Sequence, residues 1–273
     1  MGAGDQAGTI PYKLVDGRHG RFLANPNDTY VGRALIDFGE YSESECRVLT
    51  AIAPEGGNVV EIGANIGAHT VPLARRVGET GVVHAFEPQP IVFQNLCANL
   101  ALNGLANVRA YNAGCAAEAS TLIFPDIDYE QEGNFGALRL AQVAGHDRGQ
   151  EVAIRTLDSY GLDRIDLLKI DVEGMEQAVI AGARQTIERA RPVIYMEFDR
   201  SGEPERLMRM LSDLGYRLWR HRPPLFNPEN WTGRRTNPWP GVISNNLLAV
   251  HRSREAEIDG LPEIDPGRPE TFA

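Results

Sequence analysis

Two acidic residues early in the chain are spaced so that they could hold a nucleoside. Glu61 precedes the turn Gly63-Ala64-Asn65-Ile66-Gly67, whose glycines let the backbone bend sharply and approach a ligand closely. Twenty-six residues after Glu61, a second apolar run ends in Glu87-Pro88. A carboxylate at the end of the second strand can accept hydrogen bonds from both hydroxyls of a ribose. Together these residues predict a nucleoside-containing cofactor.

Three further carboxylates follow later apolar runs and are the candidates for catalysis. Asp171 and Glu173 come directly after one run, and Glu197 lies at the end of the next. Mutual repulsion and partial burial raise a carboxyl pKa, so these groups could position and deprotonate an acceptor hydroxyl. They could instead hold a divalent cation, an alternative that stays open although no metal ligand is assigned. We expect Asp171 to be the principal residue.

Other roles compete for the same side chains. Glu173 could cap the helix that follows it, and Glu197 could pair with an arginine. By strand alternation Lys169 lies on the same face as Asp171, which favours an ion pair over a catalytic role. His69, beside the glycine turn, could be a general base but is expected to be an ordinary helix histidine.

The glycine turn distinguishes two classes of cofactor. A dinucleotide fingerprint needs a bare backbone for the pyrophosphate where this chain has Asn65, which disfavours an NAD-linked oxidoreductase. The pattern Glu-x-Gly-x-Asn-x-Gly that begins at Glu61 resembles instead the first motif of class I S-adenosylmethionine methyltransferases. Two alternatives to an O-methyltransferase remain within this fold: an N-methyltransferase, and a binding protein that has lost the chemistry.

The order of motifs from about residue 30 to residue 252 is similar to the FkbM family of S-adenosylmethionine-dependent methyltransferases. The most distinctive segment is Lys169-Ile170-Asp171-Val172-Glu173-Gly174. Supporting segments are Phe38-Gly39-Glu40-Tyr41, Ala85-Phe86-Glu87-Pro88, and residues 155–159 and 245–250. The resemblance implies a class I, Rossmann-like fold with a seven-stranded sheet, and methyl transfer, usually to an oxygen on a sugar or natural product. His69 departs from the Tyr that is common at its position.

The resemblance also implies roles for individual residues. Glu61 would contact the methionine part of S-adenosylmethionine, Glu87 would hold the ribose, and Asn112 and Ala113 would lie against the adenine. The expected cofactor-binding residues are Tyr41, Glu61, Gly63, Ala64, Asn65, Gly67, Glu87, Pro88, Asn112, Ala113 and Asp171.

Composition limits the partners of the chain. Its 273 residues carry 27 basic and 37 acidic side chains, a net charge of −10, which disfavours nucleic acid and anionic membranes as partners. No apolar run approaches the ~20 residues of a membrane span. The N-terminus lacks signal-peptide features, and the three cysteines have no metal-ligand spacing. We expect a cytoplasmic enzyme with a small hydroxylated acceptor; a homodimer is left open.

Alternating patterns from residue 58 onward predict an α/β fold, a parallel sheet with helices on both faces. Strands are expected at 59–62, 82–86, 108–112, 165–170 and 193–198, and helices at 67–77, 90–103, 173–189 and 203–214. Residues 121–124 and 152–155 are expected to form a short strand pair, and 216–221 with 247–251 could form an antiparallel hairpin at one edge of the sheet. Residues 1–57 are expected to form a hairpin and helical cap, 58–252 the methyltransferase domain, and 253–273 a flexible tail.

The loop between the last two expected strands is long and rich in Pro, Asn, Trp and Arg. Aromatic rings can stack on sugars, and arginines can bind phosphate or carboxylate, so this loop could cover the acceptor. The alternative is an ordered loop or a dimer contact.

Overall fold

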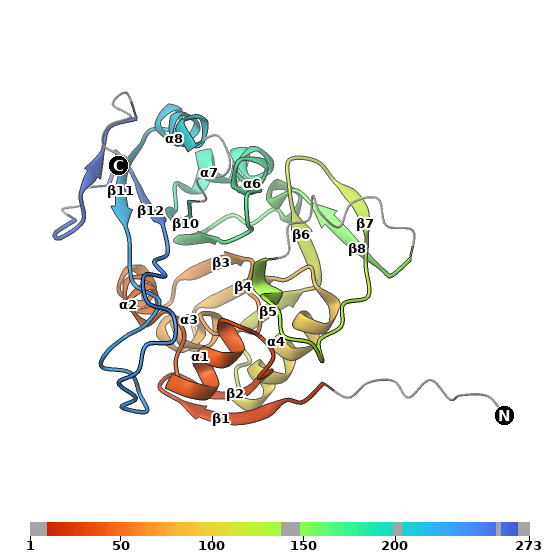
Figure 1. Cartoon of the computed structure of the whole chain (residues 1–273). Helices are drawn as coiled ribbons and strands as arrows, with labels where there is room; N and C mark the ends of the chain where they lie inside the picture. Colours follow the sequence, from red (N-terminus) through yellow and green to blue (C-terminus); the bar gives the residue numbers. More distant parts are fainter. Residues whose placement is uncertain (1–9, 138–147, 199–203, 255–257, 267–273) are drawn as a thin grey trace.

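Eight strands form the central sheet, in the order β13-β11-β12-β10-β9-β3-β4-β5 (Figure 1). The structure is a computed structural model that describes residues 10–137, 148–198, 204–254 and 258–266. In sheet order the strands are β13 (Glu263–Ile264), β11 (Tyr216–His221), β12 (Asn246–His251), β10 (Val193–Glu197), β9 (Leu167–Ile170), β3 (Asn58–Ile62), β4 (Val82–Phe86) and β5 (Val108–Tyr111). The five strands from β10 to β5 are parallel.

Layers of helices cover both faces of this sheet, as Figure 1 shows. On one face α6 (Glu176–Gly182), α7 (Arg184–Ala190) and α8 (Pro204–Asp213) pack in a core with residues of β3, β9 and β10. On the other face lie α2 (Glu43–Ile52), α3 (Thr70–Val77) and α4 (Pro90–Leu102). Burial on both faces explains why the parallel strands are almost continuously apolar. The predicted fold class is confirmed.

Two helices begin later than their sequence pattern predicts, for one physical reason. Gly67 has φ +90°, so α3 begins at Thr70 and not at residue 67. Glu173 and Gly174 have φ of +52° and +91°, which excludes them from a right-handed helix. The helix predicted over 173–189 is therefore the pair α6 and α7, and its first residues form a turn at the edge of the sheet.

A smaller three-stranded sheet lies beside β5, in the order β6-β8-β7. Its strands are β6 (Ala113–Cys115), β7 (Ser120–Phe124) and β8 (Gln150–Arg155). The predicted pairing of these two strands is confirmed, and the structure shows that β7 and β8 are antiparallel. The sequence analysis missed β6, which has three residues and pairs in parallel with β8. The loop between β7 and β8 lies partly outside the described residues.

The N-terminal segment packs on the α4 side of the sheet. It contains the hairpin of β1 (Lys13–Gly17) and β2 (Gly20–Ala24), followed by α1 (Val31–Phe38). Phe22 of β2 and Leu35 of α1 share a buried cluster with Leu96 of α4. The buried Asn99 side chain accepts from Leu23 N at 2.7 Å and donates to Ile66 O at 2.8 Å. This amide joins the hairpin to the glycine turn.

The sheet has one strand more than the seven that were predicted. Residues 253–273 were expected to be a frayed tail, yet within them β13 pairs antiparallel with β11. Ile264 is buried there, and Glu263 forms an ion pair with Arg217 at 2.9 Å. Residues 255–257 and 267–273 of the expected tail, and 1–9 of the expected cap, lie outside the described residues. No helix in the described ranges combines the length and apolarity that a membrane span requires.

Candidate active site

A cleft of about 200 Å³ opens where the parallel strands end. Strand ends and the turns that follow them supply Glu61, Gly63, Glu87, Asp171 and Glu197 to its lining. Side chains that end neighbouring parallel strands meet at one sheet edge, which is the usual ligand site of this architecture. A smaller cavity of about 40 Å³ adjoins the cleft and shares five residues with it: Gly63, Glu87, Gly136, Asp171 and Glu173. The two spaces form one elongated site.

The glycine turn lies directly against the end of β9. Gly63 has φ +85°, and a Cβ at this position would lie 1.8 Å from the carbonyl oxygen of Asp171. Asn65 also has positive φ, which asparagine tolerates better than most residues. The backbone N–H groups of Gly63 and Ala64 both donate to Phe86 O at 2.9 Å. The turn is therefore fixed to β4 on one side and β9 on the other.

Glu87 occupies the junction between the two cavities. Its Oε2 accepts from Asn65 N and its Oε1 from Gln89 N, both at 2.9 Å. Burial raises the pKa of Glu87 to about 7, against the lowering effect of these two backbone N–H groups. The side-chain amide of Asn112 donates to the carbonyl oxygens of Glu87 and Pro88 and holds this strand end in place.

A buried ion-pair network links β3 to β9. Lys169 Nζ lies 3.2 Å from Glu61 Oε1 and 3.3 Å from Asp171 Oδ2. Burial alone would lower the pKa of Lys169, but the charges of Glu61 and Asp171 outweigh it and raise the pKa above its ordinary value. Thr70 Oγ1 donates to Glu61 Oε2 at 2.6 Å. The prediction that Lys169 is an ion-pair partner is confirmed.

The three proposed catalytic carboxylates converge in the cleft. Ligand oxygens of Asp171, Glu173 and Glu197 lie within 4.8 Å of one another. Burial and the neighbouring carboxylates of Asp171 and Glu173 raise the pKa of Glu197 well above its usual range. Glu197 therefore carries a proton at neutral pH, and it shares a hydrogen bond with Asp171. The same separations are also compatible with the alternative in which these three carboxylates bind a divalent cation.

His69 was expected to be an ordinary helix histidine, but the structure places it in the lining of the cleft. Its Nε2 atom is buried without a hydrogen-bond partner. Burial and the positive charge of Lys169 hold the pKa of His69 well below its usual value, so the ring is neutral. The ring also hydrogen-bonds the backbone of Ser42 and lies 5.7 Å from the ring of Tyr41. The signal for His69 in the sequence was its position two residues after Gly67, the last residue of the glycine turn.

The lining of the cleft also includes an apolar wall. It comes from α1 and its preceding residue, and from the long loop between β11 and β12. Its members are Tyr30, Val31, Leu225, Val242 and Ile243. Ile243 is 42% exposed, so the wall extends to the mouth of the cleft.

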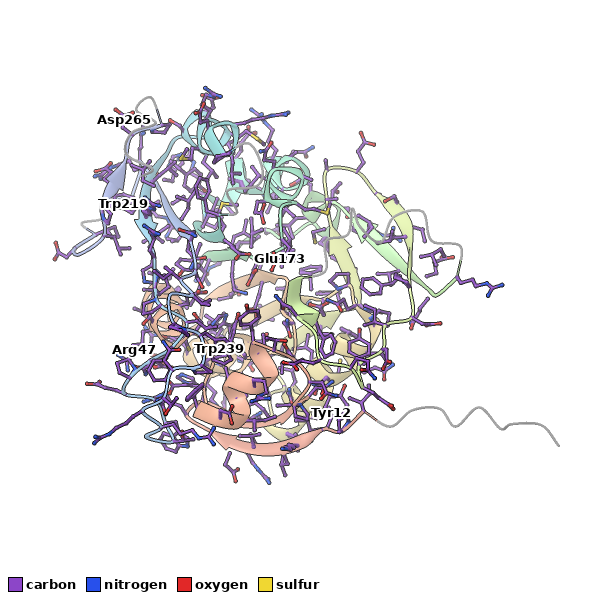
Figure 2. The ribbon with its side chains drawn as sticks, in the orientation of Figure 1. Tyr12, Arg47, Glu173, Trp219, Trp239 and Asp265 are labelled. Carbon is purple, nitrogen blue, oxygen red and sulfur yellow. The ribbon has the colours of Figure 1, made fainter. Side chains whose placement is uncertain are left out.

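The aromatic and basic side chains of the long loop are absent from the described lining of the cleft, so a role for them in covering the acceptor stays a prediction. Trp239 packs beside the rings of Tyr30 and Phe38, and Arg234 forms an ion pair with Asp37 of α1. Trp231 N donates to Glu40 Oε2 at 3.0 Å. Figure 2 shows Trp239 beside α1, Trp219 on β11, and Glu173 near the centre of the molecule. The acidic residues of the N-terminal segment thus hold the loop against α1, while other residues of the same loop line the cleft.

Most of the residues predicted to bind the cofactor line the site. Tyr41, Glu61, Gly63, Ala64, Asn65, Glu87 and Asp171 line the cleft, and Pro88 and Ala113 line the smaller cavity. Gly67 and Asn112 line neither: Gly67 packs against Leu96, and Asn112 supports Glu87. Contact of any of them with a cofactor stays a prediction.

The charge of the lining suits a cationic cofactor. Five carboxylates line the cleft, and among its described lining residues Lys169 is the sole cation. A sulfonium and an ammonium group would be stabilised there, whereas the pyrophosphate of a dinucleotide would meet negative charge without a free basic partner. Glu87, which lines both cavities at the end of β4, suits a ribose diol. The residues therefore fit S-adenosylmethionine.

Comparisons with known proteins agree with this geometry. A family model described as the methyltransferase FkbM domain matches residues 61–218. Methyltransferase sdnD from Sordaria araneosa is 31% identical over 204 residues, which cover 62% of this chain and 77% of that protein. The 31-O-demethyl-FK506 methyltransferase FkbM from Streptomyces tacrolimicus is 29% identical over 228 residues, which cover 71% of this chain and 86% of that protein. A crystal structure from Pyrococcus horikoshii, described as a transferase, shares the fold with a TM-score of 0.50 at 14% identity, covering 89% of this chain and 72% of that one.

The contact between Gly63 and β9 makes a specific prediction. Gly63→Ala should lower the free energy of unfolding by about 2–5 kcal/mol, because the methyl group overlaps the Asp171 carbonyl and the residue needs positive φ. Gly161→Ala is the matched control, since Gly161 has φ +61° and open space around its Cβ position. It should cost only about 1–2 kcal/mol. Urea unfolding measures both, and equal losses would refute the steric argument.

Proposed function

The chain belongs to the FkbM family of S-adenosylmethionine-dependent methyltransferases, and we propose that it methylates a hydroxyl oxygen on a neutral, largely apolar natural product. The observation that carries this proposal is the make-up of the cleft, which is lined by both a carboxylate cluster and an apolar wall. A hydroxyl can donate to the carboxylates while the rest of the acceptor lies against the wall. The relative from Streptomyces tacrolimicus is named for a substrate that lacks a methyl group on an oxygen.

The lining residues divide the work of binding the cofactor. Glu87 would accept the ribose hydroxyls, Pro88 and Ala113 would contact the adenine, and Glu61 with Lys169 would orient the methionine end. When bound, the cofactor supplies an electrophilic methyl group attached to a sulfonium. Because that group is intrinsically reactive, the chain's main contribution would be to position the acceptor oxygen.

Asp171 would receive the proton of the acceptor hydroxyl. It is partly exposed to the cleft and lies 3.3 Å from the Lys169 ammonium. Glu197, which holds a proton, would donate a hydrogen bond to Asp171 and so prevent a second negative charge beside it. Glu173 would add to the negative field that draws in a hydroxyl donor. An anionic acceptor would meet repulsion from all three groups.

A methyl-transfer assay with a panel of acceptors tests the proposal. The panel should hold matched derivatives of one apolar scaffold that carry a hydroxyl, an amine, a carboxylate or a phosphate. We expect transfer of labelled methyl to the neutral hydroxyl, and at least about tenfold less to the anionic derivatives, because a close charge repulsion exceeds ~1.4 kcal/mol in a partly buried site. Transfer to the amine alone would replace O-methylation with N-methylation. Preference for an anionic acceptor would overturn the proposal.

Replacing the carboxyl groups of Asp171 and Glu197 by amides should lower the methyl-transfer rate to different extents. Asp171→Asn should lower kcat by about 100-fold or more, since it removes the group that accepts the proton. Glu197→Gln retains a neutral hydrogen-bonding group of the same shape and should lower kcat by a smaller factor, about tenfold. The measurement is the initial rate with the best acceptor of the panel. A larger loss for Glu197→Gln than for Asp171→Asn would show that Asp171 is not the residue that accepts the hydroxyl proton.

Glu87 should make cofactor binding depend on pH. Its pKa of about 7 in the free protein means that it must lose a proton to accept two ribose hydroxyls as a carboxylate. The affinity for S-adenosylhomocysteine should therefore fall about tenfold per pH unit below 7 and level off above about 8. Calorimetry in buffers of different ionisation enthalpy should show proton release on binding at pH 6. The Glu87→Gln variant should bind S-adenosylhomocysteine weakly, with an affinity that does not change with pH. If its affinity still falls below pH 7, Glu87 is not the group that titrates.

A further inference from the structure

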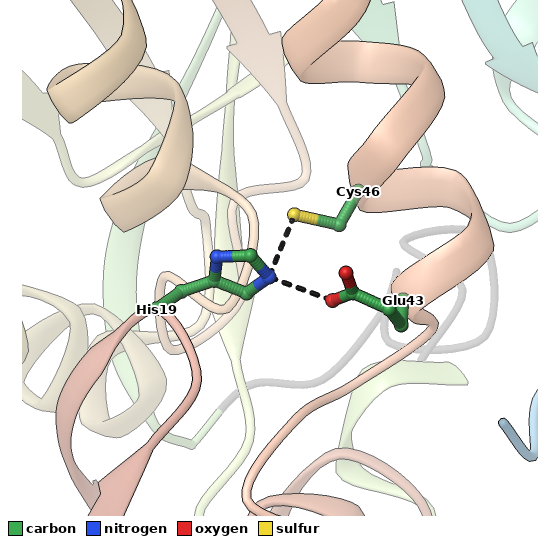
Figure 3. A group of neighbouring side chains, drawn as sticks. All are labelled: His19, Glu43 and Cys46. Atoms are coloured by element: carbon green, nitrogen blue, oxygen red, sulfur yellow. Dashed lines mark hydrogen bonds and ion pairs between the residues drawn. The ribbon is translucent and has the colours of Figure 1, made fainter. Parts of the chain in front are cut away.

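A second group of side chains with metal-binding atoms lies outside the cleft, between the N-terminal hairpin and α2. His19 lies in the turn between β1 and β2, and Glu43 and Cys46 lie one turn apart on α2 (Figure 3). His19 Nε2 is 2.6 Å from Glu43 Oε2 and 3.4 Å from Cys46 Sγ, and all three atoms lie within 4.8 Å of one another. We propose that His19, Glu43 and Cys46 form a binding site for a zinc ion.

The donor atoms and their separations suit zinc. An imidazole nitrogen, a thiolate and a carboxylate are all common zinc ligands, and the sulfur disfavours magnesium and calcium. In a tetrahedral site with ordinary zinc bond lengths, neighbouring ligand atoms are about 3.4–3.6 Å apart. The nitrogen–sulfur distance already has this value. The nitrogen–oxygen distance has to increase by less than about 1 Å, which a rotation of the Glu43 side chain provides.

The surroundings hold the three ligands in place and leave a route for the ion. Cys46 and Glu43 are buried, at 2% and 4% exposure, while the His19 side chain is 25% exposed. Arg47 Nε donates to Glu43 Oε1 at 3.1 Å and leaves Oε2 directed at His19. Arg75 donates to the carbonyl oxygen of His19 and fixes the hairpin turn. Such supporting contacts orient metal ligands in known sites.

The charges around the cluster also balance a divalent ion. The carboxylate of Glu43 and the thiolate of Cys46 supply two negative charges, the thiol proton being released to solvent on binding. Arg18 lies 3.7 Å from Glu43 Oε2, but its shorter contact, 2.6 Å, is with Glu40. The guanidinium is therefore paired chiefly with Glu40, and its contact with Glu43 is the longer one.

A catalytic relay is a poorer explanation of the same cluster. In a nucleophilic triad the acid and the nucleophile contact different nitrogens of the histidine, so that a proton can pass between them. Here Glu43 and Cys46 both contact Nε2, and Figure 3 shows the two side chains directed at that single atom. Ligand atoms that converge on one point are what a metal site requires.

Zinc at this site would stabilise the edge of the cleft. The helix α2 begins two residues after Tyr41, which lines the cleft. An ion shared by the β1–β2 turn and α2 would tie the two together and hold the segment that presents Tyr41. The ion would have a structural role, separate from methyl transfer.

Cobalt(II) titration of the metal-free full-length protein tests the site, because a cobalt–thiolate bond has a charge-transfer band in the near ultraviolet. We expect the band to saturate at one equivalent and to be absent in Cys46→Ser. Cys97→Ser is the matched control, since Cys97 is an exposed cysteine on α4, and its band should equal that of the wild type. No band in the wild-type protein, or a band that persists in Cys46→Ser, would overturn the proposal.

A second variant covers the case in which Cys46→Ser does not fold. His19 is partly exposed in a turn, so His19→Asn should fold, and it should bind zinc at least about 100-fold more weakly in competition with a chromogenic chelator. His251→Asn, which changes a partly exposed histidine far along the chain, should bind zinc as the wild type does. Equal zinc affinity for His19→Asn and the wild type would refute the site, whatever the methyltransferase activity of either protein.

Discussion

The buried pairing of Lys169 with Glu61 and Asp171 is the constraint on which the cleft depends. A lysine ammonium is tolerated inside an apolar sheet only with close opposite charges, since an unpaired buried charge costs several kcal/mol. The parallel register sets Glu61 directly opposite Lys169, and Asp171 follows at the strand end. These contacts fix the ends of β3 and β9 against each other. The glycine turn after β3 then has to pass within contact distance of Asp171, where only Gly63 fits.

The same constraint makes the site acidic and gives its carboxylates different tasks. Lys169 neutralises part of the charge of Glu61 and Asp171, but Glu87 and Glu197 lie beyond its contacts. Backbone N–H groups partly compensate Glu87, so its pKa rises only to about 7. Glu197 has the Asp171 and Glu173 carboxylates as neighbours and retains its proton. One cleft thus holds Asp171 in an ion pair with Lys169, Glu197 with a raised pKa, and Glu87 with a pKa of about 7, each determined by its surroundings.

The sequence predicted those parts of the site that depend on strand ends, and it missed those that depend on packing. Glu61, Glu87 and Asp171 follow apolar runs, and parallel strands bring such positions together without further information. The role of His69 depends on the burial of its ring against Tyr41, which no local pattern encodes. Leu225 and Val242 reach the cleft because the long loop is held on α1 through Asp37 and Glu40, contacts between residues about 190 positions apart. The strand β6 has three residues, too few to show the alternation of apolar and polar side chains that marks a strand in a sequence.

The N-terminal segment is part of the site and not an addition to it. Glu40 accepts hydrogen bonds from Arg18 of the hairpin turn, from Asn227 and from Trp231 N, and so joins three segments distant in sequence. Tyr30 and Tyr41, on either side of α1, both line the cleft. Because a buried carboxylate needs all of its partners, the hairpin, α1 and the long loop have to assemble together around Glu40. The apolar wall of the cleft therefore forms only when this assembly is complete, and substitutions far from the carboxylates can change the shape of the cleft by moving α1.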